Sequence, residues 1–87
     1  MTAPATIDDI TASVTAIAAA ELGVPAVSLV PDTDLRAIEG IDSVKVLRMI
    51  ARIERAYDVE LADEEVFGVS TIAGTAAAVS RALGERA

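Results

Sequence analysis

Residues 40–45 read Gly40-Ile41-Asp42-Ser43-Val44-Lys45. Beyond Ser43, apolar residues recur at helical spacing and predict a helix over roughly residues 43–57: Val46, Leu47, Ile50, Ile53 and Tyr57. Ser43 is therefore expected at or beside a helix N-terminus, where amide donors are unpaired and the helix dipole is positive. Because such a place suits an attached phosphate, Ser43 is a candidate for covalent modification.

A second helix signal lies upstream of this stretch. Thr6 and Asp9 match a capping box, and the apolar periodicity that follows predicts a helix that ends near Leu22-Gly23. A long connection then runs to Asp42, and about twenty unstructured residues inside a compact domain usually indicate function. We expect five apolar residues to hold this connection against the core: Val27, Leu29, Leu35, Ile38 and Ile41.

The C-terminal third of the chain carries the remaining helix signals. Asp63 can cap a single helical turn that runs to Val66, and Gly68 ends that turn. Ser70 or Thr71 then caps a last helix. The inward face of this helix is expected to consist of Ile72, Ala76, Val79 and Leu83.

These signals together describe one small helical domain. A chain of 87 residues can bury only one modest core, and the two aromatic residues, Tyr57 and Phe67, fall on apolar positions and are expected there. We predict an all-α four-helix bundle with three main helices, a short third helix and a long loop between helices one and two. The domain is expected to cover residues 1–87, with an ordered core at about 6–84.

Composition narrows the range of functions. The chain has no cysteine and no histidine, so it lacks disulfides, ordinary zinc ligands and the commonest general base, and neither a metal site nor an autonomous enzyme is expected. Fourteen acidic and seven basic residues give a formal net charge of -7, which repels nucleic acid and anionic membranes. The chain has no apolar span and no basic secretion signal, so a cytoplasmic protein is expected.

Five segments follow one another in an order that is informative as a whole. They are Asp32-Thr33-Asp34-Leu35, Gly40-Ile41-Asp42-Ser43-Val44, Arg52-Ile53-Glu54-Arg55-Ala56-Tyr57-Asp58-Val59-Glu60-Leu61, Ala62-Asp63-Glu64-Glu65 and Ser70-Thr71-Ile72. An aspartate-serine pair alone is a weak signal, whereas this order and spacing are specific. Over nearly the whole chain the segments resemble the acyl carrier proteins and the related peptidyl carrier domains, whose motif is Gly-x-Asp-Ser-Leu.

The resemblance implies a function for the candidate serine. Ser43 would be esterified by 4′-phosphopantetheine from coenzyme A, whose thiol carries acyl or aminoacyl groups as thioesters. Asp42 would take part in recognition by the phosphopantetheinyl transferase. The chain would be a monomeric, non-catalytic carrier, and its partners would be that transferase, a loading enzyme, and the synthases and tailoring enzymes of a pathway.

The sequence departs from the family pattern in three places. Val44 stands where the family has leucine, and residues 36–39 lengthen the loop. The second helix, usually acidic on its outer face, carries four basic residues within about 80° on a helical wheel: Lys45, Arg48, Arg52 and Arg55. We expect these cations, together with Val44 and Ile41, to be the residues at which partner enzymes dock. The alternative is that acidic residues of this chain neutralise the four cations. The candidate acids are Asp32, Asp34, Glu39 and the acidic residues of the third helix.

The reversed charge of the second helix argues against a generic fatty-acid carrier, whose partners usually present basic patches. The sequence therefore predicts a free-standing carrier in polyketide or nonribosomal peptide biosynthesis. The alternatives are a fatty-acid carrier, a carrier-like interaction module that is never primed, and a helical nucleic-acid binder, which the net charge opposes. For Ser43 the alternative is an ordinary helix cap, a role that Asp42 can also fill.

Overall fold

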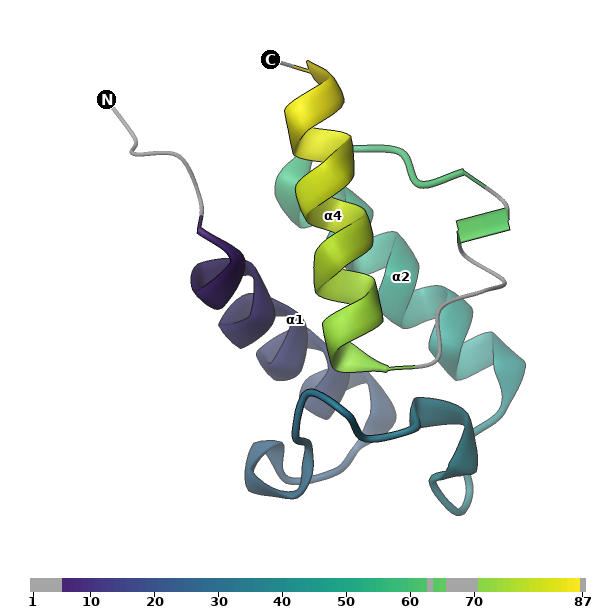
Figure 1. Ribbon diagram of the computed structural model, residues 1–87. Coiled ribbons are helices and arrows are strands. Elements are labelled where there is room, and N and C mark those ends of the chain that lie inside the picture. The colour runs from purple at the N-terminus through teal and green to yellow at the C-terminus, as the bar shows by residue number, and fades with distance from the viewer. Residues whose placement is uncertain (1–5, 63, 66–70, 87) are drawn as a thin grey trace.

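Three helices make up most of the described structure (Figure 1). The computed structural model describes residues 6–62, 64–65 and 71–86. The helices are α1 (Ile7–Leu22), α2 (Ser43–Tyr57) and α4 (Ile72–Arg86). The chain forms two short 3-10 turns between α1 and α2, η1 (Ala26–Ser28) and η2 (Leu35–Ala37). No described helix is long and apolar enough to cross a bilayer.

The predicted capping box begins α1. The Thr6 hydroxyl accepts a hydrogen bond from the Asp9 amide at 3.1 Å, and the Asp9 carboxylate accepts one from the Thr6 amide at 3.3 Å. These two bonds satisfy amides that have no partner inside the helix. At the other end Gly23 takes a left-handed conformation (φ 71°), which glycine adopts without the steric penalty of a side chain. Both predicted ends of the first helix are confirmed.

The other two helices also begin at side-chain caps. The Asp42 carboxylate accepts a hydrogen bond from the Lys45 amide at 2.9 Å, and the Thr71 hydroxyl accepts one from the Gly74 amide at 2.9 Å. Thr71 therefore caps α4, one of the two residues predicted for that role. The span predicted for the second helix is confirmed as well: the helix ends at Tyr57, and Asp58 follows as its C-terminal cap with a left-handed φ of 54°.

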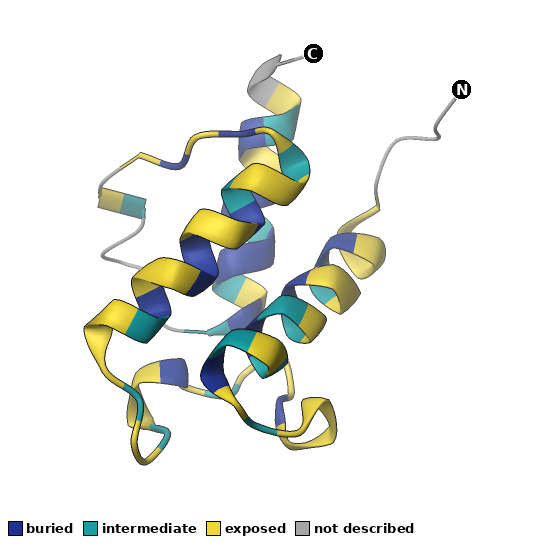
Figure 2. Ribbon diagram, turned by 180° about the vertical axis from the view of Figure 1, so that it is seen from behind, coloured by how far each residue is buried: buried dark blue, intermediate teal, exposed yellow. Residues whose placement is uncertain are grey.

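The core lies where α1 packs against both α2 and α4. Figure 2 shows the buried faces of the helices turned toward one another and the exposed faces turned outward. The fully buried side chains include Ile10 and Val14 of α1, Met49 and Ile53 of α2, and Ile72 and Val79 of α4. The inward face predicted for the last helix is confirmed, with Leu83 half-buried at its margin.

The apolar face predicted for α2 needs two corrections. Leu47 is 48 % exposed, whereas Met49, absent from the predicted pattern, is fully buried. At 100° per residue Leu47 lies about 110° from the centre of the buried face and Met49 only about 50° from it. Tyr57 is half-buried and packs against the core, as predicted.

The long connection lies against the end of the bundle, and most of its predicted anchors are confirmed. Leu29 and Leu35 are buried, and Ile38 and Ile41 are half-buried against the core. Val27 was predicted to be an anchor, but it is 92 % exposed because η1 directs it to solvent. Backbone pairing joins the loop to α4: the Ala73 amide donates to the Pro31 carbonyl at 2.9 Å, and Asp34 and Thr71 form an isolated β-bridge.

The segment after α2 is held by a side chain of that helix. The Glu54 carboxylate accepts a hydrogen bond from the Leu61 amide at 2.8 Å, and Val59 and Leu61 are buried beside it. Glu64 and Glu65 are helical, in agreement with the predicted short third helix. The other residues of that prediction, Asp63, Val66, Gly68 and Ser70, lie outside the described residues, as does Phe67.

Candidate functional site

The structure separates the roles of Asp42 and Ser43. Asp42 has extended backbone angles (φ -114°, ψ 172°) and caps α2, so Ser43 is the first residue of the helix rather than its cap. The Ser43 side chain is exposed, and within the described part of the chain its hydroxyl makes no hydrogen bond. A capping role therefore does not explain the serine.

The surroundings of Ser43 fit an attached phosphate. The Lys45 amide is satisfied by the Asp42 carboxylate and the Val46 amide by the Asp42 carbonyl at 3.3 Å. The Ser43 and Val44 amides come before these in the first turn and have no acceptor among the described residues. Unpaired amides and the positive end of the helix dipole favour a negative group at this position.

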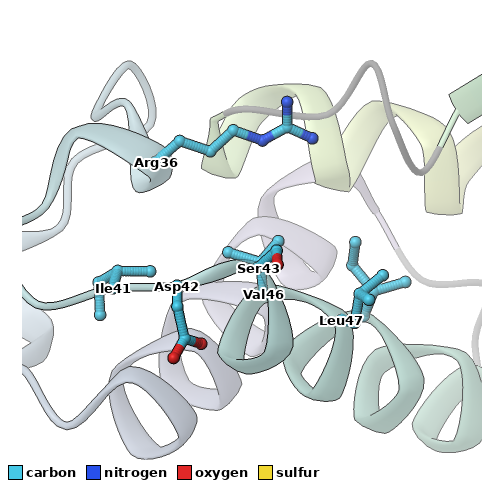
Figure 3. Close-up of a pocket in the computed structure, with 7 residues that line it drawn as sticks. Arg36, Ile41, Asp42, Ser43, Val46 and Leu47 are labelled. Atoms are coloured by element: carbon cyan, nitrogen blue, oxygen red, sulfur yellow. The ribbon is translucent and has the colours of Figure 1, made fainter.

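A hollow of about 360 Å³ lies beside the serine. Its lining consists of Arg36, Ile41, Asp42, Ser43, Val46, Leu47 and Ile50. Four of these seven side chains are apolar, and four come from the first two turns of α2. In Figure 3 the Arg36 side chain extends from η2 along the far side of the hollow, whereas the Asp42 carboxylate points away from it. Ser43 thus lies at the rim of an apolar recess, with its hydroxyl accessible.

The candidate docking residues lie on the outside of α2 and at its start. Val44 is 54 % exposed, and Arg48 and Arg55 are exposed. Lys45 and Ile41 are half-buried. The structure thus brings Ser43, Asp42, Ile41 and Val44 together at one end of α2 and spreads the basic residues along the helix.

One basic residue of α2 is neutralised within the chain, by an acid outside the predicted set. Arg52 pairs with Glu21 of α1 at 3.0 Å. Of the acids that were considered, Asp34 caps η2 by accepting a hydrogen bond from the Arg36 amide, and Glu65 pairs with Arg81. Glu21 is the only charged residue between Asp9 and Asp32. This isolated charge near the end of an otherwise apolar helix is the sequence feature from which an ion pair of Glu21 could have been predicted.

A family model described as "Phosphopantetheine attachment site" matches residues 12–79, most of the chain. The chain belongs to this family of phosphopantetheine-binding carriers. Two solved structures share its fold over 99 % of its length. The HMG-ACPI domain of the CurA module from Lyngbya majuscula is 16 % identical, with 89 % of that chain covered and a TM-score of 0.79. The oxytetracycline acyl carrier protein is 24 % identical, with 90 % covered and a TM-score of 0.72. These structural likenesses confirm the prediction that this chain has the all-α fold of the acyl carrier proteins.

Domains of this family are sites of covalent 4′-phosphopantetheine attachment. When bound, the group supplies a thiol that holds acyl groups as thioesters, and this carrier has no cysteine of its own. The exposed hydroxyl of Ser43, the free amides of the first turn and the adjoining hollow are the features of the carrier that fit the group.

Proposed function

We propose that Ser43 of this carrier bears 4′-phosphopantetheine and that the protein shuttles thioester-bound acyl or aminoacyl intermediates between enzymes of polyketide or nonribosomal peptide biosynthesis. The observation that supports the proposal best is the position of Ser43. Ser43 is the first residue of α2 and lies beside the hollow. Its hydroxyl is exposed and makes no hydrogen bond with another described residue. Ser13, Ser28 and Ser80 are exposed too, but none lies at the start of a long helix.

The attachment step needs only an accessible oxygen from this chain. The Ser43 Oγ forms a bond to the phosphorus of coenzyme A that bears the pantetheine arm, and the P–O bond of the pyrophosphate breaks. Adenosine 3′,5′-bisphosphate leaves, and the hydroxyl proton passes to a base of the transferase. The first-turn amides of α2 then face a phosphodiester, an interaction of roughly 0.3–1 kcal/mol.

The proposed partners follow from this role. Carrier domains of the family interact with synthases and modifying enzymes and are generally non-catalytic. For this chain we propose a phosphopantetheinyl transferase, a loading enzyme, and pathway synthases and tailoring enzymes. The carrier tethers the intermediate and raises its effective concentration at each active site. We also propose that the protein is a monomer and that it acts in the cytoplasm.

Intact-mass measurement before and after incubation with coenzyme A and a broad-specificity phosphopantetheinyl transferase tests the attachment. We expect a gain of one phosphopantetheine, and fragmentation of the modified protein is expected to place it on Ser43. A folded protein that gains no mass would contradict the proposal and favour an interaction module that is never primed. A gain on another serine would contradict the assignment of Ser43.

The Asp42→Asn variant separates the two roles considered for Asp42. Asparagine caps helices about as well as aspartate, so the stability is expected to change by no more than about 0.5 kcal/mol. Loading of Ser43 is expected to slow several-fold, because the transferase would no longer meet the carboxylate. The measurement is the initial rate of mass gain, with a urea unfolding curve of the same variant as the control. An unchanged rate would leave Asp42 as a cap alone.

A further inference from the structure

The outward side of α2 carries three strips of side chains. Residues seven apart on a helix lie only about 20° apart around its axis, so each such pair forms a strip along the helix. The strips are Val44 with Ala51, Arg48 with Arg55, and Lys45 with Arg52. The four basic residues therefore form two parallel strips rather than one uniform face.

The strip of Lys45 and Arg52 lies on the side of α2 that faces α1. Arg52 pairs there with Glu21 at 3.0 Å, and the Glu21 side chain is only 20 % exposed. Lys45, two turns earlier on the same strip, is half-buried. The Arg52 side chain itself is 45 % exposed, so this strip differs from a solvated one by its ion pair to α1 and by the partial burial of Lys45.

The strip of Arg48 and Arg55 has a different environment. Both residues are exposed, and neither forms an ion pair or a hydrogen bond with another described residue. In a protein with a net charge of -7, two adjacent cations without an acidic partner form a local patch of opposite sign. Val44 lies beside this strip at its Ser43 end, and Leu47 lies next to Val44 on the side away from the arginines. The two residues are 54 % and 48 % exposed.

We propose that Val44, Leu47, Arg48 and Arg55 form a docking surface for a partner enzyme that presents an apolar recess followed by carboxylates. The inference rests on the carrier function proposed above. Val44 and Leu47 contact the apolar recess of the partner beside the attachment serine. Arg48 and Arg55, one to three turns further along α2, pair with the partner's carboxylates. The same arginines repel a basic docking patch. Lys45 and Arg52 are not part of the surface, although all four cations were predicted as docking residues.

A charge-swapped enzyme provides the test. The probe is a β-ketoacyl synthase of fatty-acid synthesis in two forms, with its basic carrier-docking patch and with the basic residues of that patch replaced by glutamate. The carrier is loaded from an acyl-coenzyme A that the synthase accepts, and loading is verified by mass. Turnover of a small acyl-pantetheine thioester, which needs no docking surface, shows that both synthase forms are active.

Two double variants of the carrier form a matched pair. Arg48→Gln with Arg55→Gln and Lys45→Gln with Arg52→Gln each remove two positive charges from the same helix. We expect the unaltered carrier to have a KM about tenfold lower with the glutamate form than with the basic form. The Arg48/Arg55 variant is expected to lose this preference, and the Lys45/Arg52 variant to keep it within about twofold. Val44→Thr, which retains the shape of the side chain, is expected to raise KM several-fold with both forms.

Equal effects of the two double variants would overturn the inference, because net charge alone would then explain docking. A preference for the basic form would also overturn it. Binding of double-stranded DNA that depends on Arg48 and Arg55 would assign the strip to nucleic acid instead. Loading separates the two proposals: if the carrier takes up no acyl-phosphopantetheine at all, the carrier function fails and the docking surface with it, whereas normal loading without charge preference refutes the docking surface alone.

Discussion

The Ser43→Ala variant is expected to lose phosphopantetheine loading completely while its stability stays within about 0.5 kcal/mol of the original protein. Alanine has no oxygen to form the phosphate ester. Its stability is preserved because Asp42, not Ser43, caps α2, and because the Ser43 hydroxyl makes no hydrogen bond among the described residues. Loss of function without loss of fold is the signature of a modification site.

Intact mass after incubation with transferase and coenzyme A measures the loading, and urea unfolding followed by circular dichroism measures the stability. Ser13→Ala and Ser80→Ala are matched controls, since both serines are exposed on helices of the same domain, and both variants are expected to load fully. Continued loading of Ser43→Ala would move the attachment site elsewhere. A large loss of stability in that variant would show that Ser43 has a structural role that its contacts do not indicate.

The Ile53→Ala variant is expected to lose about 2–5 kcal/mol of unfolding free energy. Ile53 is fully buried between α2 and the rest of the core, and truncation removes apolar contacts and leaves a cavity. Small domains are stable by only about 5–15 kcal/mol, so the change is a large fraction of the total. We expect Tm to fall by roughly 10 °C or more.

Leu47→Ala is the matched control on the same helix. Leu47 is half exposed, so its truncation removes much less buried area, and we expect its loss of stability to be under about 1 kcal/mol. Thermal and urea unfolding of both variants check the two values. Comparable losses would mean that Leu47 and Ile53 are equally buried, contrary to the helix orientation described above.

Local sequence signals were sufficient to predict the helices. Thr6 and Asp9 form their capping box within four residues, and Gly23 ends the helix through its own backbone freedom. The bounds of α2 were predicted in the same way, from polar residues before it and apolar periodicity within it. These features depend on neighbours along the chain, so the sequence alone reveals them.

Features that depend on packing between distant segments could not be predicted in the same way. Periodicity did not give the rotation of α2 about its axis, so Leu47 was placed inside and Met49 was missed. Val27 was expected to anchor the loop because it is apolar, but the direction of a loop side chain depends on the turn that holds it. The Glu21–Arg52 pair joins residues 31 apart along the chain.

The candidate site falls between these two cases. The position of Ser43 near a helix start was predicted correctly, whereas its exact role relative to Asp42 was not, since both residue types are good caps. The backbone angles of Asp42 decide the question, and they are a property of the folded turn. The hollow was not predicted, because Arg36 and the α2 side chains that line it meet only once the loop has folded back.

The loop between α1 and α2 also shows where this carrier can be altered. Buried Leu29, the Pro31–Ala73 hydrogen bond and the Asp34–Thr71 bridge fix the part of the loop that leads to α2. The η1 turn precedes all of these anchors and is exposed throughout. A peptide tag, or a tether to another protein, inserted at η1 would leave the approach to Ser43 in place. The turn is thus a natural grafting point for building synthetic carrier fusions.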